Sequence, residues 1–151
     1  MLAFSALMAS AFHLGITAFF AACFPFKEAT RGSLISLTTE IRQGIDNSIV
    51  ELAVSVPSHF VIADGIEAME GNGPLHGPMR RLGCLVFADD PVAADATCCR
   101  LMGIDPGRVR HLQMASPLGN LDITKIEQRG ESVERVMQRF ELLPEFAHLR
   151  G

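Results

Sequence analysis

Carboxylates follow two short apolar runs of the sequence, and these acids are the residues whose types and spacing could do chemistry. The run His59–Ala63 leads directly into Asp64, and the run Cys84–Ala88 leads into Asp89 and Asp90. The carboxyl ends of parallel strands meet at one edge of a sheet, where loops carry binding and catalytic groups. The spacing therefore predicts that two neighbouring strands bring these acids, which are far apart in the chain, to one place.

A glycine-rich acidic loop follows the first run. It contains Glu67 and Glu70, then Gly71-Asn72-Gly73-Pro74, and then His76. Glycine adopts positive φ readily, so successive amides can converge on an anion. Carboxylates beside such amides are a usual way to hold Mg²⁺ or Ca²⁺. The pattern indicates either a ligand site or a loop with solvated acids, and His76 is either an acid, base or ligand there or an exposed side chain without a role.

The second run is followed by the start of a helix. Asp90 is the expected cap, and Pro91 takes the first helical position. Asp95 falls on the predicted buried side of this helix. A carboxylate there must be paired, hydrogen-bonded or metal-bound, because an unpaired buried charge is costly. We expect Asp95 to be a ligand facing the loop of the first strand, an ion-pair partner of Arg80 or Arg81, or an acceptor of hydrogen bonds from loop amides.

The residues expected to bind a ligand come from the loop, the strand ends and this helix: Asp64, Glu70, Gly71, Asn72, Gly73, His76, Asp90 and Asp95. Of these, Asp64, Glu70 and Asp95 are the expected metal ligands, and the cofactor expected is a divalent cation, Mg²⁺ or Ca²⁺. The loop amides would receive a small anionic ligand. The sequence does not identify a reaction.

The bulk composition is that of one domain spanning residues 1–151. Hydrophobic residues make up 48% of the chain, and the net charge is −4 with a pI near 5.7. There is no basic footprint for a nucleic acid. The four cysteines form no C-x-x-C pair, which argues against a zinc ribbon or an iron–sulfur cluster in this chain. Buried, reduced thiols in a cytoplasmic protein are expected instead.

The hydrophobic pattern predicts an α/β fold with a small, mainly parallel sheet and flanking helices. The expected strands are His59–Ala63, Cys84–Ala88 and an edge strand over Ile123–Gln128. The expected helices are Gly44–Val54, one from Pro91 closed by Gly103, one from Pro106 to about Ala115, and an amphipathic one over Val133–Phe140. Leu142–Leu149 is expected to be an apolar tail that packs back onto the body.

The first 26 residues carry no charged side chain. That length could cross a bilayer. His13 and Gly15 interrupt the segment, however, and no basic residue precedes it, which argues against export. A buried strand–helix pair is favoured, with a membrane-anchored form as the alternative, and a cytoplasmic location is expected.

The chain resembles the prokaryotic "domain of unknown function 362" family, many of whose members are described as iron–sulfur cluster-binding proteins. The resemblance rests on IVELA at 49–53, FVIADGIEAMEGNGPLHG at 60–77, LGCLVFADDPVAADATCCRLMGIDP at 82–106 and LGNLDITKIEQRGES at 118–132. It covers residues 44–150 as a family-like core and leaves 1–43 as a divergent N-terminal segment. HLGIT at 13–17 is similar to a His-then-Gly-x-Thr segment of the family.

The resemblance implies that this chain corresponds to the C-terminal half of a larger domain. The Lys-Asn pair that commonly follows the family's Thr is replaced here by Phe19-Phe20, and the ferredoxin cysteines are absent, so no iron–sulfur cluster is expected. A ferredoxin-type redox partner is implied by the family. Half a domain leaves apolar surface and sheet edges uncovered, so the rival to a ligand-binding site is an interaction module or a homo-oligomer.

Overall fold

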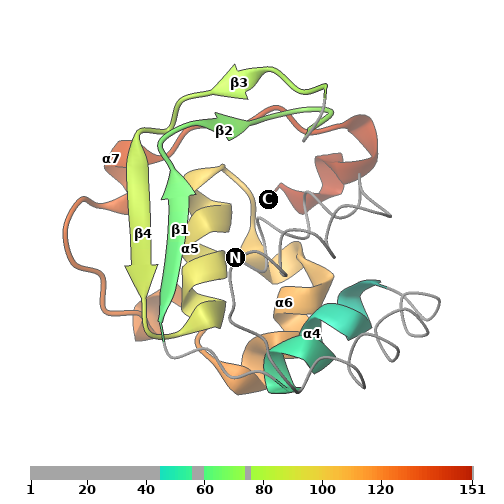
Figure 1. Ribbon diagram of the computed structural model, residues 1–151, viewed down its shortest axis with the longest axis vertical. Helices are drawn as coiled ribbons and strands as arrows, with labels where there is room; N and C mark the ends of the chain where they lie inside the picture. Colours follow the sequence, from blue (N-terminus) through green and yellow to red (C-terminus); the bar gives the residue numbers. More distant parts are fainter. Residues whose placement is uncertain (1–44, 56–59, 74–75, 151) are drawn as a thin grey trace, which may run out of the picture.

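The computed structural model describes residues 45–55, 60–73 and 76–150. Its elements pack as a two-stranded sheet against helices, with a small hairpin beyond one end of the sheet (Figure 1). The helices are α4 (Ile45–Ser55), α5 (Pro91–Leu101), α6 (Arg110–Ala115) and α7 (Val133–Val136). The strands are β1 (Val61–Gly65), β2 (Ala68–Met69), β3 (Met79–Arg80) and β4 (Cys84–Ala88), and short 3₁₀ turns cover Pro106–Arg108, Ser116–Leu118, Ile123–Lys125 and Pro144–Leu149.

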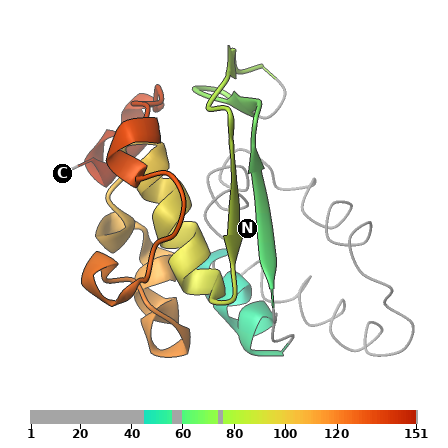
Figure 2. The ribbon, with the colours of Figure 1, turned by 90° about the vertical axis from the view of Figure 1, so that its left-hand side faces the viewer.

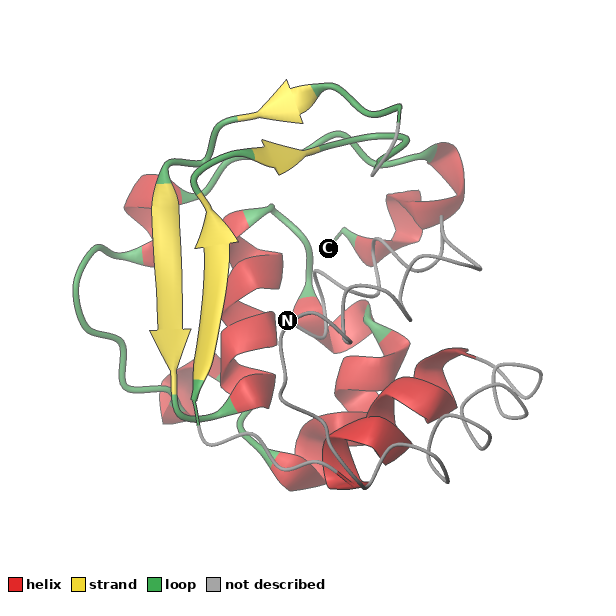
Figure 3. Cartoon of the chain, viewed as in Figure 1, coloured by secondary structure: helices red, strands yellow, loops and turns green. Residues whose placement is uncertain are grey.

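The two expected main strands exist, but the prediction that the sheet is mainly parallel is wrong. β1 pairs with β4 in antiparallel register, from Val61 opposite Ala88 to Gly65 opposite Cys84. Parallel strands need a long crossover, usually a helix. The described parts of the connection, residues 66–73 and 76–83, contain no helix. The chain leaves the sheet through β2 and comes back through β3, so it re-enters the sheet in the opposite direction (Figure 3).

The connection predicted to be a long loop therefore includes a short hairpin. Ala68 lies opposite Arg80 and Met69 opposite Met79. At its base the Gly83 amide donates to the carbonyl oxygens of Gly65 and Ile66, at 3.0 and 3.2 Å. This hairpin extends the β1–β4 pair rather than leaving an open loop above it.

Helix α5 covers one face of the β1–β4 pair (Figure 2). It starts as predicted, with Asp90 as the cap and Pro91 at the first helical position. It ends at Leu101, and Gly103 follows with φ +71°, a left-handed conformation that glycine adopts without strain. Eight of its eleven residues are buried, so α5 is the central element of the core.

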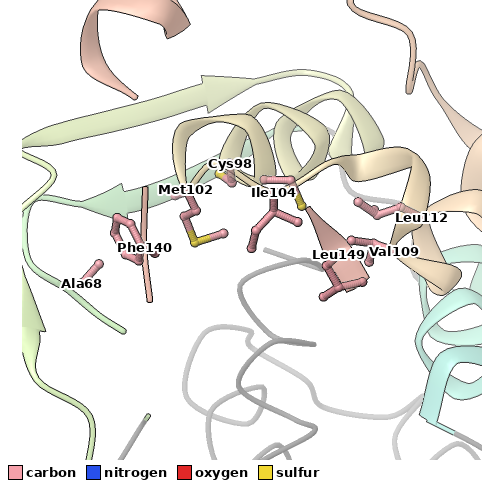
Figure 4. Packing of buried hydrophobic residues seen from close by; sticks show 10 residues of the cluster. Ala68, Cys98, Met102, Ile104, Val109, Leu112, Phe140 and Leu149 are labelled. Atoms are coloured by element: carbon pink, nitrogen blue, oxygen red, sulfur yellow. The ribbon is translucent and has the colours of Figure 1, made fainter. Parts of the chain in front are cut away.

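The core lies between α5, the hairpin and the C-terminal segments. Cys98, Met102, Ile104, Leu112 and Phe140 lie in one cluster (Figure 4). Cys98 and Cys99 are free and buried, as the sequence predicted, whereas Cys84 on β4 is only half-buried. Burial raises the pKa of the Cys98 thiol to about 11 and raises that of Cys99 further, so both sulfurs are held as neutral apolar groups.

Two predictions for the C-terminal third are wrong in part. The helix expected over Val133–Phe140 stops at Val136. Beyond it the Gln138 and Phe140 amides donate to the carbonyls of Leu101 and Met102, at 2.9 and 3.1 Å, so the segment runs along the end of α5. The Phe140 ring is 2% exposed. Its burial in this extended segment stabilises the fold more than a longer helix would, although the 3.6-residue spacing of the apolar residues predicted that helix.

Segment Ile123–Gln128 is not a strand in the structure. Asp122 accepts hydrogen bonds from the Thr124 amide and hydroxyl, and this starts the 3₁₀ turn Ile123–Lys125. The helix expected from Pro106 to about Ala115 is divided into a 3₁₀ turn and α6. The tail prediction is confirmed, since Leu149 is buried and its carbonyl accepts from the Asp105 amide at 2.9 Å.

Candidate functional site

Asp64 and Asp95 lie on opposite faces of the sheet. Asp64 points outward from β1, and its Oδ1 accepts a hydrogen bond from the Ile66 amide two residues on, at 2.9 Å. Asp95 is 0% exposed on α5, which packs on the other face. The structure therefore does not bring these two expected metal ligands together.

The antiparallel pairing also separates the two strand ends. Asp64 lies opposite Leu85, near the beginning of β4, whereas Asp89 and Asp90 follow its far end. The expectation that neighbouring strands deliver the acids to one edge depended on a parallel sheet, and it is wrong for that reason. The roles of the individual acids as ligands stay a prediction.

Glu70 ties the hairpin to the C-terminal part of the chain. Its Oε2 accepts from the Glu141 amide at 2.9 Å, and the adjacent Gly71 amide donates to the Glu141 carbonyl at 3.0 Å. Its Oε1 lies 3.8 Å from the guanidinium of Arg80. The Glu70 side chain is 9% exposed, and these contacts give it a structural role in this conformation.

The described residues on either side of positions 74 and 75 are held close together. Gly71 has φ +64°, which only glycine adopts without strain, and the His76 amide donates to the Asn72 carbonyl at 3.2 Å. A Cβ on Gly77 would overlap the Glu70 carbonyl. Asn72 and His76 are exposed and Gly73 is half-buried. The sequence analysis expected the loop amides to face an anion, but the Gly71 amide is already bonded to the Glu141 carbonyl.

Asp90 uses both carboxylate oxygens within the protein. Oδ1 accepts from the Val92 and Ala93 amides at 2.9 and 3.0 Å. Oδ2 accepts from the backbone amide and the side-chain amide of Asn120, at 2.7 and 3.1 Å. Asp90 thus caps α5 and holds the segment that follows Gly119 against its start.

A buried histidine that the sequence analysis did not single out lies near Asp95. His111 on α6 is 3% exposed, and its Nδ1 lies 3.3 Å from Oδ1 of Asp46 on α4. Burial lowers the pKa of His111, and the negative charges of Asp46 and Asp95 oppose this shift. The sequence did indicate that His111 is buried, because His111 and Leu112 share the buried side of the helix predicted after Pro106.

Neither a metal cluster nor a membrane-crossing helix is present in the described part of the chain. Within residues 45–55, 60–73 and 76–150, no group of three or more His, Cys, Asp or Glu side chains is placed to hold a metal ion. No helix in the same ranges is long and apolar enough to cross a membrane. The uncharged segment 1–26, on which the membrane-anchored alternative depended, lies outside the described residues, and so does His59.

The most conspicuous exposed surface is apolar. On the side of the β1–β4 pair away from α5, four large side chains are exposed: Phe60 (61%), Ile62 (55%), Leu85 (45%) and Phe87 (58%). The rings of Phe60 and Phe87 lie 6.2 Å apart between centroids. We call these four residues the outer apolar face. Contiguous apolar surface of this kind is typical of interaction sites.

A groove of about 1000 Å³ runs beside β4. One wall is β4 along its whole length, and the other is the segment 125–131. Residues of α5, among them Ala93, Ala94 and Thr97, form its floor. Asp89, Asp90 and Asn120 lie at one end.

The comparisons with known proteins point to one family. The sequence model of a family described as "Domain of unknown function (DUF362)" matches residues 8–100, which begins inside the segment expected to be divergent. The "Thylakoid-associated protein sll1697" of Synechocystis sp. is 35% identical over 71 residues, 47% of this chain and 22% of that protein. The matched region therefore spans less than a quarter of that relative. No solved structure matches the chain.

Proposed function

The chain belongs to the family described as Domain of unknown function (DUF362), and from its outer apolar face we propose that it is an interaction module that docks a helix of another polypeptide. The supporting observation is that one sheet face is covered by α5 while the other exposes Phe60, Ile62, Leu85 and Phe87. An antiparallel sheet can leave one face to water, but that face then carries mainly polar side chains, whereas this one carries four large apolar ones. No helix among the described residues covers it, and a helix is an element that packs on such a face.

The charges around the face favour a partner with basic ends. Asp64 lies opposite Leu85, and one register step beyond β1 brings Phe60 opposite Asp89, so two exposed carboxylates stand at opposite corners of the face. Two copies packed face to face would bring four carboxylates around one apolar patch, and like charges across an interface cost free energy. The proposed partner is an amphipathic helix with an apolar stripe and Lys or Arg at both ends.

The expected affinity is low. Full burial of a Leu, Ile or Phe side chain contributes about 1.5–3 kcal/mol, so covering these half-exposed side chains contributes about 1 kcal/mol each. The total of about 4 kcal/mol would by itself correspond to a Kd of about 1 mM, and exposed ion pairs at the corners add at most about 1 kcal/mol each. The loss of translational and rotational freedom opposes this gain. A Kd of about 1 mM or weaker is therefore expected, which suits a transient contact, or one strengthened by a covalent link to the partner.

An NMR titration tests this proposal with a defined probe. The full chain is labelled at Ile and Leu methyls and titrated with a synthetic Leu/Ala helical peptide that has Lys at both ends; the control peptide has Glu ends. The Ile62 and Leu85 methyl signals should shift and saturate with the first peptide and bind the second at least threefold more weakly. Ile123 and Leu118, which are similarly exposed elsewhere, should not shift.

Variants sharpen the test. Ile62→Thr and Phe87→Ser should each weaken peptide binding several-fold, whereas Leu118→Ser should leave it unchanged. Equal shifts at all four methyls, or none at saturating peptide, would contradict the proposal. A stable dimer that Phe87→Ser dissociates would also overturn it, because the occupant would then be a second copy.

Divalent-cation binding by one of the acids Asp64, Glu70 and Asp95 remains the second candidate function, although the structure separates Asp64 from Asp95. It predicts that millimolar Mg²⁺, Mn²⁺ or Ca²⁺ raises the melting temperature of the full chain, because a ligand that binds only the folded state stabilises it. Asp64→Asn, Glu70→Gln and Asp95→Asn, tested one at a time, should identify the acid that binds, because only its loss abolishes the increase. A melting temperature that none of the three ions changes would count against this site.

A cytoplasmic location is part of the proposal. The curated relative's name calls that protein thylakoid-associated, and within the described ranges of this chain no helix is able to span a membrane. Fractionation of the expressed chain without detergent tests the proposal. Recovery in the soluble fraction supports it, and recovery only in the membrane pellet, resistant to a salt wash, contradicts it.

A further inference from the structure

β4 has a second edge at which the described residues provide no strand. Its sheet has the order β1–β4 and no further strand among the described residues. In a strand, alternate residues point their N–H and C=O groups to opposite edges. The backbone groups of β4 that do not bond β1 therefore face the groove, and such a row is a template for another strand.

The groove runs along the full length of β4. It follows the strand from Cys84 to Ala88, and segment 125–131 lines it as well. The five residues of β4 span about 16 Å at 3.3 Å per residue, and an added strand lies about 4.8 Å away. A second copy would bring its own segment 125–131 against this one, so an isolated extended segment fits the groove better than the β4 edge of a second copy.

The floor of the groove is small and apolar. Ala93 and Ala94 on α5 lie there, together with Thr97, whose hydroxyl is already bonded to the Ala93 carbonyl at 2.7 Å. Small side chains on the floor leave space for the inward-pointing residues of an added strand. β-branched residues at alternate positions of the partner fit this space.

Most of the charges on the rim are paired with one another. Arg129 lies 2.8 Å from Glu127, and Arg135 lies 3.0 Å from Glu131. Asp89 and Lys125 also lie on the rim, with opposite signs. The rim therefore offers little net charge to attract an acidic or basic partner. Recognition must come from the backbone edge and the apolar floor.

We propose that this groove binds an extended peptide segment of another polypeptide, which adds to β4 as a third strand with β-branched side chains at alternate positions. This is strand addition, in which main-chain hydrogen bonds give affinity and alternate side chains give specificity. The groove borders the outer apolar face, because Phe60, Leu85 and Phe87 also line it, whereas Ile62 does not. The strand proposal depends on the free edge of β4 and the helix proposal on the apolar face, so either proposal can fail alone.

Amide hydrogen exchange of the full chain tests the proposal by NMR. In the free protein, the amides of β4 should form two alternating sets, one bonded to β1 and one facing the groove. One set is Leu85 and Phe87, and the other is Cys84, Val86 and Ala88. The set bonded to β1 should exchange at least tenfold more slowly than the set facing the groove. Uniform slow exchange along β4 would overturn the proposal, because the edge would then be occupied already.

The probe is the peptide Lys-Val-Thr-Val-Thr-Val-Lys with blocked ends, and the control has proline in place of the central valine. At millimolar concentration the first peptide should slow the groove-facing amides at least threefold, and the control should not, because proline removes a ladder hydrogen bond. Absence of protection by the first peptide, or equal protection by both peptides, would overturn the proposal.

Matched variants locate the site. Thr97→Arg should fill the groove and abolish the protection, whereas Thr97→Val keeps the volume and should retain it. If Thr97→Arg does not fold, Gln128→Trp on the opposite wall serves the same purpose. Ile62→Thr should leave this protection intact while it weakens helix binding to the outer apolar face, so the two proposals are tested independently.

Discussion

Removing the Asp90 carboxylate should destabilise the protein through two separable contributions. Asp90→Ala deletes the cap of α5, which costs about 1 kcal/mol. It also deletes the acceptor of two Asn120 hydrogen bonds. Hydrogen bonds to a charged group contribute about 1.5–3 kcal/mol when buried. Asn120 is exposed, so in the variant water can replace the lost acceptor, and the net loss is about 1 kcal/mol. The expected loss is about 2 kcal/mol.

Two further substitutions separate the contributions. Asp90→Ser keeps a cap acceptor but cannot reach Asn120, so it should lose about 1 kcal/mol. Asp105→Ala is the matched control. Asp105 caps a short 3₁₀ turn through an exposed bond to the Gly107 amide and forms an exposed ion pair with Arg108, so its loss should cost less than about 0.5 kcal/mol.

The assay is equilibrium urea unfolding of the full chain, with the midpoint and slope fitted for each variant. A shift of the midpoint at constant slope reports stability directly. The reasoning would be refuted if Asp90→Ala stayed within about 0.5 kcal/mol of the unsubstituted protein, or if Asp90→Ser were as destabilising as Asp90→Ala.

Three other predictions follow from named contacts. Because burial lowers the pKa of His111 below 6.5, the unfolded state binds the proton more tightly, so stability should fall as pH decreases from 6.5 towards the folded-state pKa. His111→Gln should remove that slope in urea unfolding measured from pH 5 to 8, and a slope that persists unchanged would contradict this assignment. Gly119→Ala should cost about 1–3 kcal/mol because its Cβ would overlap the Asp90 carboxylate, and the cost should shrink in an Asp90→Ala background; strictly additive losses would show that the overlap is not the cause. Leu112→Ala, at 0% exposed, should cost about 2–5 kcal/mol, whereas Leu118→Ala on the surface should cost less than about 1 kcal/mol, and similar losses would contradict the placement of the core.

Local signals in the sequence predicted the elements well where one physical cause dominates. The Asp90-Pro91 pair fixed the start of α5, because a carboxylate cap and a preset φ act on the nearest residues alone. The strand Cys84–Ala88 was predicted with its exact bounds. The burial of Asp95 followed from its spacing on the helix.

Relations between distant segments could not be obtained in the same way. Acids at two strand ends look alike for parallel and antiparallel pairing, and only the connection through β2 and β3 decides between them. The point at which the helix predicted over Val133–Phe140 ends likewise depends on the carbonyls at the end of α5, which accept from the amides of Gln138 and Phe140. Spacing within a segment carries no information about such partners.

The candidate site was the part predicted least well, because its residues bond to partners far along the chain. Glu70 was predicted as a metal ligand, but its contact in the structure is with the Glu141 amide. Asp90 is the cap of α5 as predicted, and it also accepts from Asn120. These partners lie far along the chain, and no local motif marks them. The outer apolar face was anticipated only as uncovered surface, without its residues.

Hydroxyl-radical footprinting of the full chain tests the central claim, that the outer apolar face is open to a partner, most directly. Phe60 and Phe87 are exposed on that face, whereas Phe140 is buried, so side-chain oxidation of the three rings can be compared within one sample by mass spectrometry. Rapid oxidation of Phe60 and Phe87 with slow oxidation of Phe140 is the predicted result. Equal protection of all three rings would mean that the face is already covered and would contradict the proposed docking function.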